Sequence, residues 1–103
     1  MAGRIEAYIH SDSIVPNKGG CLIELQCQTD FAARTDAFIG FARKVAKLMF
    51  GYGAKGWQEL IEECPVLEDE RRQLELDLKE RVQVSQVAIL RLGNGDMQAS
   101  AEK

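Results

Sequence analysis

The sequence predicts an α+β fold, a small three-stranded antiparallel sheet with helices on one face, in the order β-β-α-α-α-β. Residues 3–10 and 21–28 alternate apolar and polar side chains with a period of two, and residues 84–92 have high β-propensity. Between these segments, apolar residues recur at helical spacing from residue 29 to residue 82. A chain of 103 residues is long enough for one continuous core. Packing the helices against one face of the sheet buries all of these apolar surfaces together.

The first two segments also predict how the first two strands pair. One face of residues 3–10 carries isoleucines and an alanine, and one face of residues 21–28 carries two cysteines, an isoleucine and a leucine. If both apolar faces point to the core, paired residues must have numbers with an even sum, as with Ala7 opposite Ile23. We therefore expect Cys21 and Cys27 on the core face and His10 on the other. Residues 11–20 are rich in turn formers, although ten residues is long for a hairpin loop.

The middle of the chain predicts three helices. The first runs to about residue 50, and either Thr29 or Thr35 could cap its start. Glycines in residues 51–56 end it, and a short helix beginning near Trp57 follows. Pro65 either ends that helix or opens the next, which spans residues 66–82 and carries acidic and basic residues in i,i+4 pairs.

The end of the chain predicts a last strand and a tail. Glycines at 93 and 95 stop the strand at residues 84–92, and the following residues are polar. We therefore expect a single domain over residues 1–95 and a flexible C-terminal tail over residues 96–103.

Composition and charge exclude several classes of protein. Thirteen basic and sixteen acidic residues give a net charge of −3, with seven basic and five acidic residues up to residue 58 and six basic and eleven acidic ones after it. Without a clustered basic surface, we expect no direct binding of nucleic acid. The apolar runs are too short to cross a membrane, and the N-terminus does not resemble a signal peptide, so we expect no membrane association and a cytoplasmic location. Three cysteines at irregular spacing suit a reducing compartment.

The sequence offers little for catalysis. One histidine and three cysteines without CxxC spacing are too few for a zinc site, so we expect no metal and no cofactor. A Cys–His nucleophile pair is the constellation that the composition allows, but the expected strand register points His10 away from Cys21 and Cys27. The glycines near residue 53 lack the strand–loop–helix context of a phosphate-binding loop. We therefore predict no catalytic residues and a protein that is not an enzyme.

Phe31 is the residue with two competing interpretations. It lies where the second strand turns into the first helix, between Asp30 and the Ala32-Ala33-Arg34 segment. In one interpretation it begins the apolar stripe of the helix, seven residues before Phe38. In the other it is presented to solvent on a rigid corner, where it could enter a pocket of a partner protein.

A resemblance to a known family favours the second interpretation. Residues 26–38, Gln-Cys-Gln-Thr-Asp-Phe-Ala-Ala-Arg-Thr-Asp-Ala-Phe, resemble the signature segment of bacterial elongation factor Ts, the guanine-nucleotide exchange factor for elongation factor Tu. Ala32 stands where the family usually has valine. The resemblance covers roughly residues 3–92, including both strands before this segment and the helix and strand after it. Residues that match the family's pattern are Cys27, Thr29, Asp30, Phe31, Ala33, Arg34 and Phe38.

The resemblance implies both a fold and a function. It identifies residues 1–95 with the core subdomain of elongation factor Ts, and Thr29, Asp30, Phe31, Ala33 and Arg34 with its partner-binding segment. It implies that Asp30 and Phe31 enter the GTPase domain of elongation factor Tu near the Mg²⁺ and phosphate site, so that GDP leaves. No segment of the 103 residues resembles the family's small three-helix domain, so we expect weaker binding. A module that recruits or sequesters elongation factor Tu without nucleotide exchange is the alternative, and two copies of the chain could pair as a homodimer.

Overall fold

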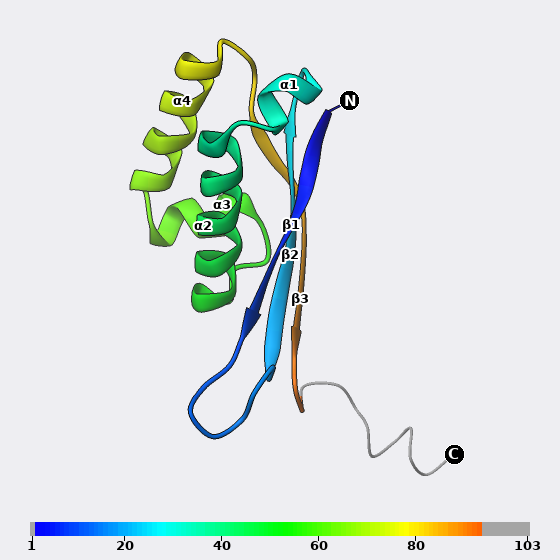
Figure 1. Ribbon diagram of the computed structural model, residues 1–103. Helices are drawn as coiled ribbons and strands as arrows, with labels where there is room; N and C mark the ends of the chain where they lie inside the picture. The colour runs from blue at the N-terminus through cyan, green and yellow to red at the C-terminus, as the bar shows by residue number, and fades with distance from the viewer. Residues whose placement is uncertain (1, 94–103) are drawn as a thin grey trace, which may run out of the picture.

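The computed structural model describes residues 2–93 and contains the three-stranded antiparallel sheet that the sequence predicts. Its strands are β1 (Ala2–His10), β2 (Gly19–Cys27) and β3 (Gln83–Arg91), with β2 in the centre. Over residues 2–93, all helices lie on one side of this sheet and its other side carries none (Figure 1). The predicted fold class is therefore confirmed. The expected tail at residues 96–103, and the domain end at residue 95, lie outside the described residues.

The helical region contains α1 (Asp30–Ala33), α2 (Asp36–Tyr52), α3 (Trp57–Glu63) and α4 (Val66–Leu78). The first predicted helix is thus two helices, because Thr29 caps α1 and Thr35 caps α2. Pro65 opens α4. The helix expected over residues 66–82 ends earlier because Lys79 adopts a left-handed conformation with φ 59°. The residues after it turn back toward the sheet.

The core lies between the helices and the inner face of β2. Cys21, Ile23, Leu25 and Cys27 are buried there, as the alternation in residues 21–28 predicts. The helices contribute most of the remaining buried side chains, and these are mostly aliphatic or aromatic. They include Phe38, Phe41, Ala42, Val45, Ala46, Met49, Phe50, Leu60, Leu67 and Leu74.

The predicted pairing of β1 with β2 is wrong. The observed partners have numbers with an odd sum, so Ala7 lies opposite Leu22 rather than Ile23. A shift of one residue turns every side chain of a strand to the other face. His10 therefore lies on the helix-facing side, and Ile9, which was expected in the core, is 61% exposed.

Aromatic packing explains this register. The Tyr8 ring lies 5.7 Å from the ring of Phe50, and the His10 ring lies 5.2 Å from it. The Tyr8 hydroxyl and His10 Nδ1 share a hydrogen bond of 2.8 Å. These two rings supply more contact with α2 than Ala7 could. The face of β1 that carries the more polar residues therefore packs against the helices. The isoleucines of β1 are left on the open face of the sheet.

Candidate partner-binding site

The predicted site lies on the corner between β2 and α2, which we define as residues 28–35. Thr29 is extended (φ −129°, ψ 149°) and its hydroxyl oxygen accepts a hydrogen bond of 3.2 Å from the amide of Ala32. This is the usual arrangement of a threonine N-cap, and it fixes the start of the single-turn helix α1.

The buried alanines of α1 determine the direction of Phe31. Ala32 is 5% exposed and Ala33 is 7% exposed, because both pack into the core. On a one-turn helix, two consecutive buried residues leave the preceding side chain pointing outward. Phe31 is accordingly 86% exposed. The interpretation in which Phe31 begins the apolar stripe of a helix is therefore wrong.

The far end of α1 is fixed by Thr35. Its hydroxyl donates a hydrogen bond of 2.8 Å to the Ala32 carbonyl and accepts one of 3.2 Å from the Phe38 amide. The Arg34 amide donates to the Phe31 carbonyl at 3.3 Å. Both ends of α1 are thus tied by threonine side chains, one of them shared with α2.

The structure separates the five predicted site residues into two groups. Thr29, Asp30, Phe31 and Arg34 are exposed on the corner, where a partner could reach them. Ala33 is buried, so it supports α1 from the core side and its side chain is not available for contact. The small alanines are what allows α1 to lie close against the sheet.

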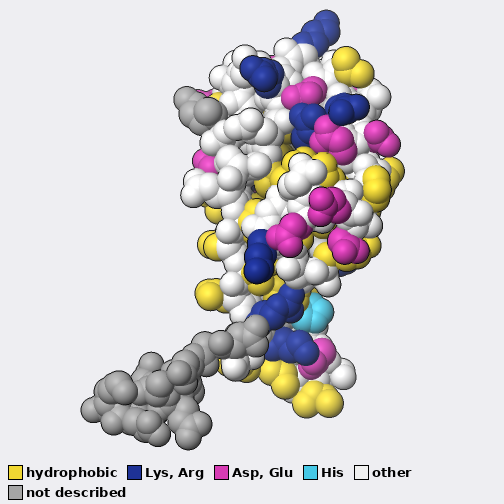
Figure 2. Space-filling view, turned by 180° about the vertical axis from the view of Figure 1, so that it is seen from behind, with side chains coloured by type: hydrophobic (Ala, Val, Ile, Leu, Met, Phe, Trp, Pro, Cys, Tyr) yellow, Lys and Arg dark blue, Asp and Glu magenta, His cyan; other side chains and the backbone are white. Residues whose placement is uncertain are grey.

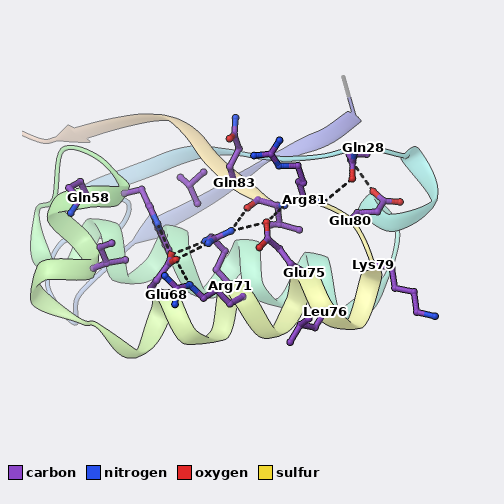
Figure 3. A pocket seen from close by; sticks show the side chains of 15 residues that line it. Gln28, Gln58, Glu68, Arg71, Glu75, Leu76, Lys79, Glu80, Arg81 and Gln83 are labelled. Carbon is purple, nitrogen blue, oxygen red and sulfur yellow. Dashed lines mark hydrogen bonds and ion pairs between the residues drawn. The ribbon is translucent and has the colours of Figure 1, made fainter.

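Sequence reasoning missed one residue at this site, Glu80. Its carboxylate accepts hydrogen bonds of 2.9 Å from the amides of Gln28 and Thr29, and it also accepts one from the Thr29 hydroxyl. Figure 3 shows Glu80 beside Gln28. The hydrogen bond from the Thr29 hydroxyl is the main cause that lowers the pKa of Glu80. Because Glu80 follows these residues by more than 50 positions, no local pattern in the sequence could indicate the contact.

A groove of about 1190 Å³ runs between α4 and the start of β3 (Figure 3). Its central group is Arg71, which bonds Glu68 at 2.7 Å and Glu75 at 2.9 Å and donates to the Val82 carbonyl at 2.8 Å. Hydrogen bonds from Arg71 lower the pKa of Glu68 to about 2. The charges of these three side chains are satisfied within the chain, so they hold α4 against the start of β3.

The observed register changes the argument about a thiol nucleophile. His10 lies on the same face of the sheet as Cys21, contrary to expectation. However, its Nδ1 atom bonds the Tyr8 hydroxyl, and burial raises the pKa of the Cys21 thiol and of the Cys27 thiol. Raised pKa values favour the protonated, unreactive thiol. Among residues 2–93, no group of three or more His, Cys, Asp or Glu side chains could hold a metal ion.

On the face of the molecule drawn in Figure 2, charged side chains do not gather into a single patch of one sign. Lysine and arginine side chains alternate with aspartate and glutamate over the face in Figure 2. Nucleic-acid binders usually present a basic stripe, and this face does not. Over the described part of the chain, no helix has the length and apolarity needed to span a membrane.

Comparison with known proteins points to the same family as the sequence motif. Over 48 residues the chain is 46% identical to elongation factor Ts of Ralstonia nicotianae, which covers 47% of this chain and 16% of that protein. The chain is similar to elongation factor Ts. The likeness extends to Rubrobacter xylanophilus, with 50% identity over 44 residues (43% of this chain, 20% of the relative). For Clostridium botulinum it is 38% over 61 residues (59% and 19%). No protein-family profile matches the chain.

The similarity to elongation factor Ts is partial on both sides. It covers about half of this chain and no more than a fifth of each of these relatives. It agrees with the observed architecture, since an elongation factor Ts-like core accounts for a three-stranded sheet with helices on one face. The activity and the partners of the full-length relatives are therefore proposals for this chain.

Proposed function

We propose that this chain binds elongation factor Tu and promotes the release of GDP, with Phe31 and Asp30 entering the GTPase domain near its Mg²⁺ and phosphate site. The observation that carries this proposal is Phe31, which is 86% exposed on a helix whose two ends are both fixed. The chain acts in the cytoplasm, where translation takes place. It is an exchange factor in translation elongation and performs no covalent chemistry.

Presentation of Phe31 favours a role in binding. Transfer of an aromatic side chain out of water is favourable, and full burial of a phenylalanine stabilises a fold or complex by about 1.5–3 kcal/mol. Phe31 is not buried within the chain, so this favourable free energy of burial is available for binding a partner. Since α1 is already ordered, little conformational entropy is lost when Phe31 enters a pocket. Asp30 and Arg34 flank it with one charge of each sign, which would fix its orientation.

Nucleotide release follows from linkage between two binding equilibria. If the chain binds nucleotide-free elongation factor Tu more tightly than the GDP form, it must weaken GDP by the same factor. An aromatic ring that occupies space beside the Mg²⁺ and phosphate site would create this difference. The surrounding residues cannot adopt the arrangement that GDP requires and the arrangement that the ring requires at the same time. No general base, nucleophile or metal of the chain is required.

The proposal is tested by the release of fluorescent GDP from elongation factor Tu as the chain is added. We expect acceleration that rises with chain concentration and is lost in Phe31→Ala. Ile14→Ala is the matched control, because Ile14 is 85% exposed in the β1–β2 loop, at the opposite end of the molecule from α1 (Figure 1). An unchanged release rate at micromolar wild-type chain would refute the proposal. Binding with retention of GDP would instead indicate a recruitment or sequestration module.

We also propose that two copies pair through the open face of the sheet. Leu22 stands at the centre of this face, between Ala7 and Ala88 on the neighbouring strands. A leucine flanked by two alanines can interlock with the same arrangement in a second copy, as a two-fold interface requires. Leu90, 80% exposed at one end of the face, would extend the contact. Light scattering should give twice the chain mass for wild type and the single mass for Leu22→Lys; a monomeric wild type would refute this pairing.

A further inference from the structure

Glu80 connects the corner that carries Phe31 to a distant part of the chain. Its Oε1 atom accepts the amides of Gln28 and Thr29, both at 2.9 Å, and its Oε2 atom accepts the Thr29 hydroxyl. In return, the side-chain oxygen of Gln28 accepts the Arg81 amide at 2.9 Å. Figure 3 shows Gln28, Glu80 and Arg81 close together beyond the end of α4. Four hydrogen bonds thus join segments that neither the sheet nor a helix joins.

These bonds fall where the backbone has no regular partners. The last residue of β2 that pairs with β3 is Gln26, and Cys27 is the last that pairs with β1. Gln28 and Thr29 therefore lie beyond the sheet, and α1 begins only at Asp30. Without Glu80, their amides would have water as a partner. The carboxylate replaces a strand neighbour at this point, so it sets the direction in which the chain leaves the sheet.

Glu80 also determines how Thr29 caps α1. The Thr29 hydroxyl can donate one hydrogen bond, and it donates to Glu80. Its oxygen is then directed to accept from the Ala32 amide. The contact depends in turn on the end of α4, because the left-handed Lys79 turns the chain and the Glu80 amide bonds the Glu75 carbonyl at 3.3 Å. Glu80, which follows α4, is thus half-buried and directed toward the corner by the turn at Lys79.

We propose that Glu80 is a positioning residue for Phe31: by binding Gln28 and Thr29 it holds the start of α1 in one orientation, so that the exposed ring is presented in a fixed direction. This inference rests on the proposed function only for what Phe31 does to a partner. A ring on a loose corner must be ordered during binding, and that ordering weakens the complex. Loss of the contact should therefore reduce activity without altering the residues that touch the partner.

The first experiment uses the chain alone, so it does not depend on the proposed function. Amide hydrogen exchange and ¹⁵N relaxation are compared for wild type, Glu80→Ala and Asp12→Ala. Asp12 is the matched control because its carboxylate also accepts two backbone amides, those of Ile14 and Val15, but in the β1–β2 loop at the other end of the molecule. We expect Glu80→Ala to remove protection of the Gln28 and Thr29 amides and to lower the order parameters of residues 30 and 31. Wild-type values in Glu80→Ala would overturn the inference.

The second experiment measures the consequence for GDP release from elongation factor Tu. At subsaturating chain, Glu80→Ala should lower the acceleration about tenfold and Asp12→Ala should not. Glu80→Gln should recover part of the loss, since its amide oxygen still accepts from Gln28 and Thr29 while the acceptor for the Thr29 hydroxyl is lost. A loosened corner with full exchange activity would overturn the inference. An inactive wild type whose corner loosens in Glu80→Ala would refute the proposed function and leave the assignment of Glu80 as the residue that orders the corner.

Discussion

Replacing Tyr8 and Ile9 one at a time by threonine tests which face of β1 packs against the helices. Sequence alternation assigns Ile9 to the core and Tyr8 to the surface, whereas the observed register does the opposite. Threonine suits a strand at both positions, so strand propensity changes little. The two substitutions therefore differ mainly in the contacts that each removes.

The expected magnitudes follow from burial and contacts. Tyr8 is half-buried, its ring lies 5.7 Å from the Phe50 ring at an interplanar angle of 55°, and its hydroxyl bonds His10. Half of the free energy for burying a large side chain is about 1 kcal/mol, and an aromatic pair adds about 1 kcal/mol. We expect Tyr8→Thr to lower the free energy of unfolding by about 2 kcal/mol. Ile9 is mostly exposed, and its replacement should cost about 0.5 kcal/mol.

Urea denaturation followed by circular dichroism gives both values. The measurement is made at two protein concentrations, because an Ile9 contact with a second copy would make its effect depend on concentration. A loss for Ile9→Thr that equals or exceeds the loss for Tyr8→Thr at low concentration would refute the register and the packing argument based on it.

Two further predictions concern stability. Gly3 has φ 146°, and a Cβ atom there would lie 2.2 Å from the Leu25 carbonyl oxygen, so Gly3→Ala should lower the free energy of unfolding in urea by about 2 kcal/mol or more. Gly40→Ala, inside α2 with open space around it, should instead raise it by about 0.5–1 kcal/mol, and equal effects would contradict this assignment. Glu68 has a pKa lowered to about 2 by Arg71, below the ordinary 4.5. The contribution of ionised Glu68 to stability is present above about pH 4.5 and is lost as the pH falls toward 2. We therefore expect Glu68→Gln to make the free energy of unfolding fall less steeply between pH 5 and pH 2.5. The same slope in wild type and Glu68→Gln would contradict this prediction.

The sequence predicts the elements better than it predicts their pairing. Periodicity locates the first two strands and the helical region, because burial imposes a period of two or about 3.6 on the side chains, and β-propensity locates the third strand. The register fails because β1 has apolar groups on both faces: the Tyr8 ring packs as a core residue, although its hydroxyl made its face look polar. The two threonines that looked like alternative caps are both used, since the buried Ala32 and Ala33 hold a separate turn between them.

The sequence also predicts one part of the candidate site and not the other. Its motif is local, so residues 29–34 can be found by resemblance to a family and their exposure is then read from the structure. The side chain of Ala33 is the exception, because its burial depends on how α1 meets the sheet. The contribution of Glu80 depends on the left-handed turn at Lys79 and on a contact across the fold, and neither leaves a pattern in the sequence.

We propose that Phe31 couples binding of this chain to loss of GDP from elongation factor Tu. Isothermal titration of the chain into nucleotide-free and into GDP-loaded elongation factor Tu measures that coupling directly. We expect at least tenfold tighter binding to the nucleotide-free form for the wild type, and a ratio of the two affinities near one for Phe31→Ala. Equal affinities of the wild-type chain for the two forms would contradict it.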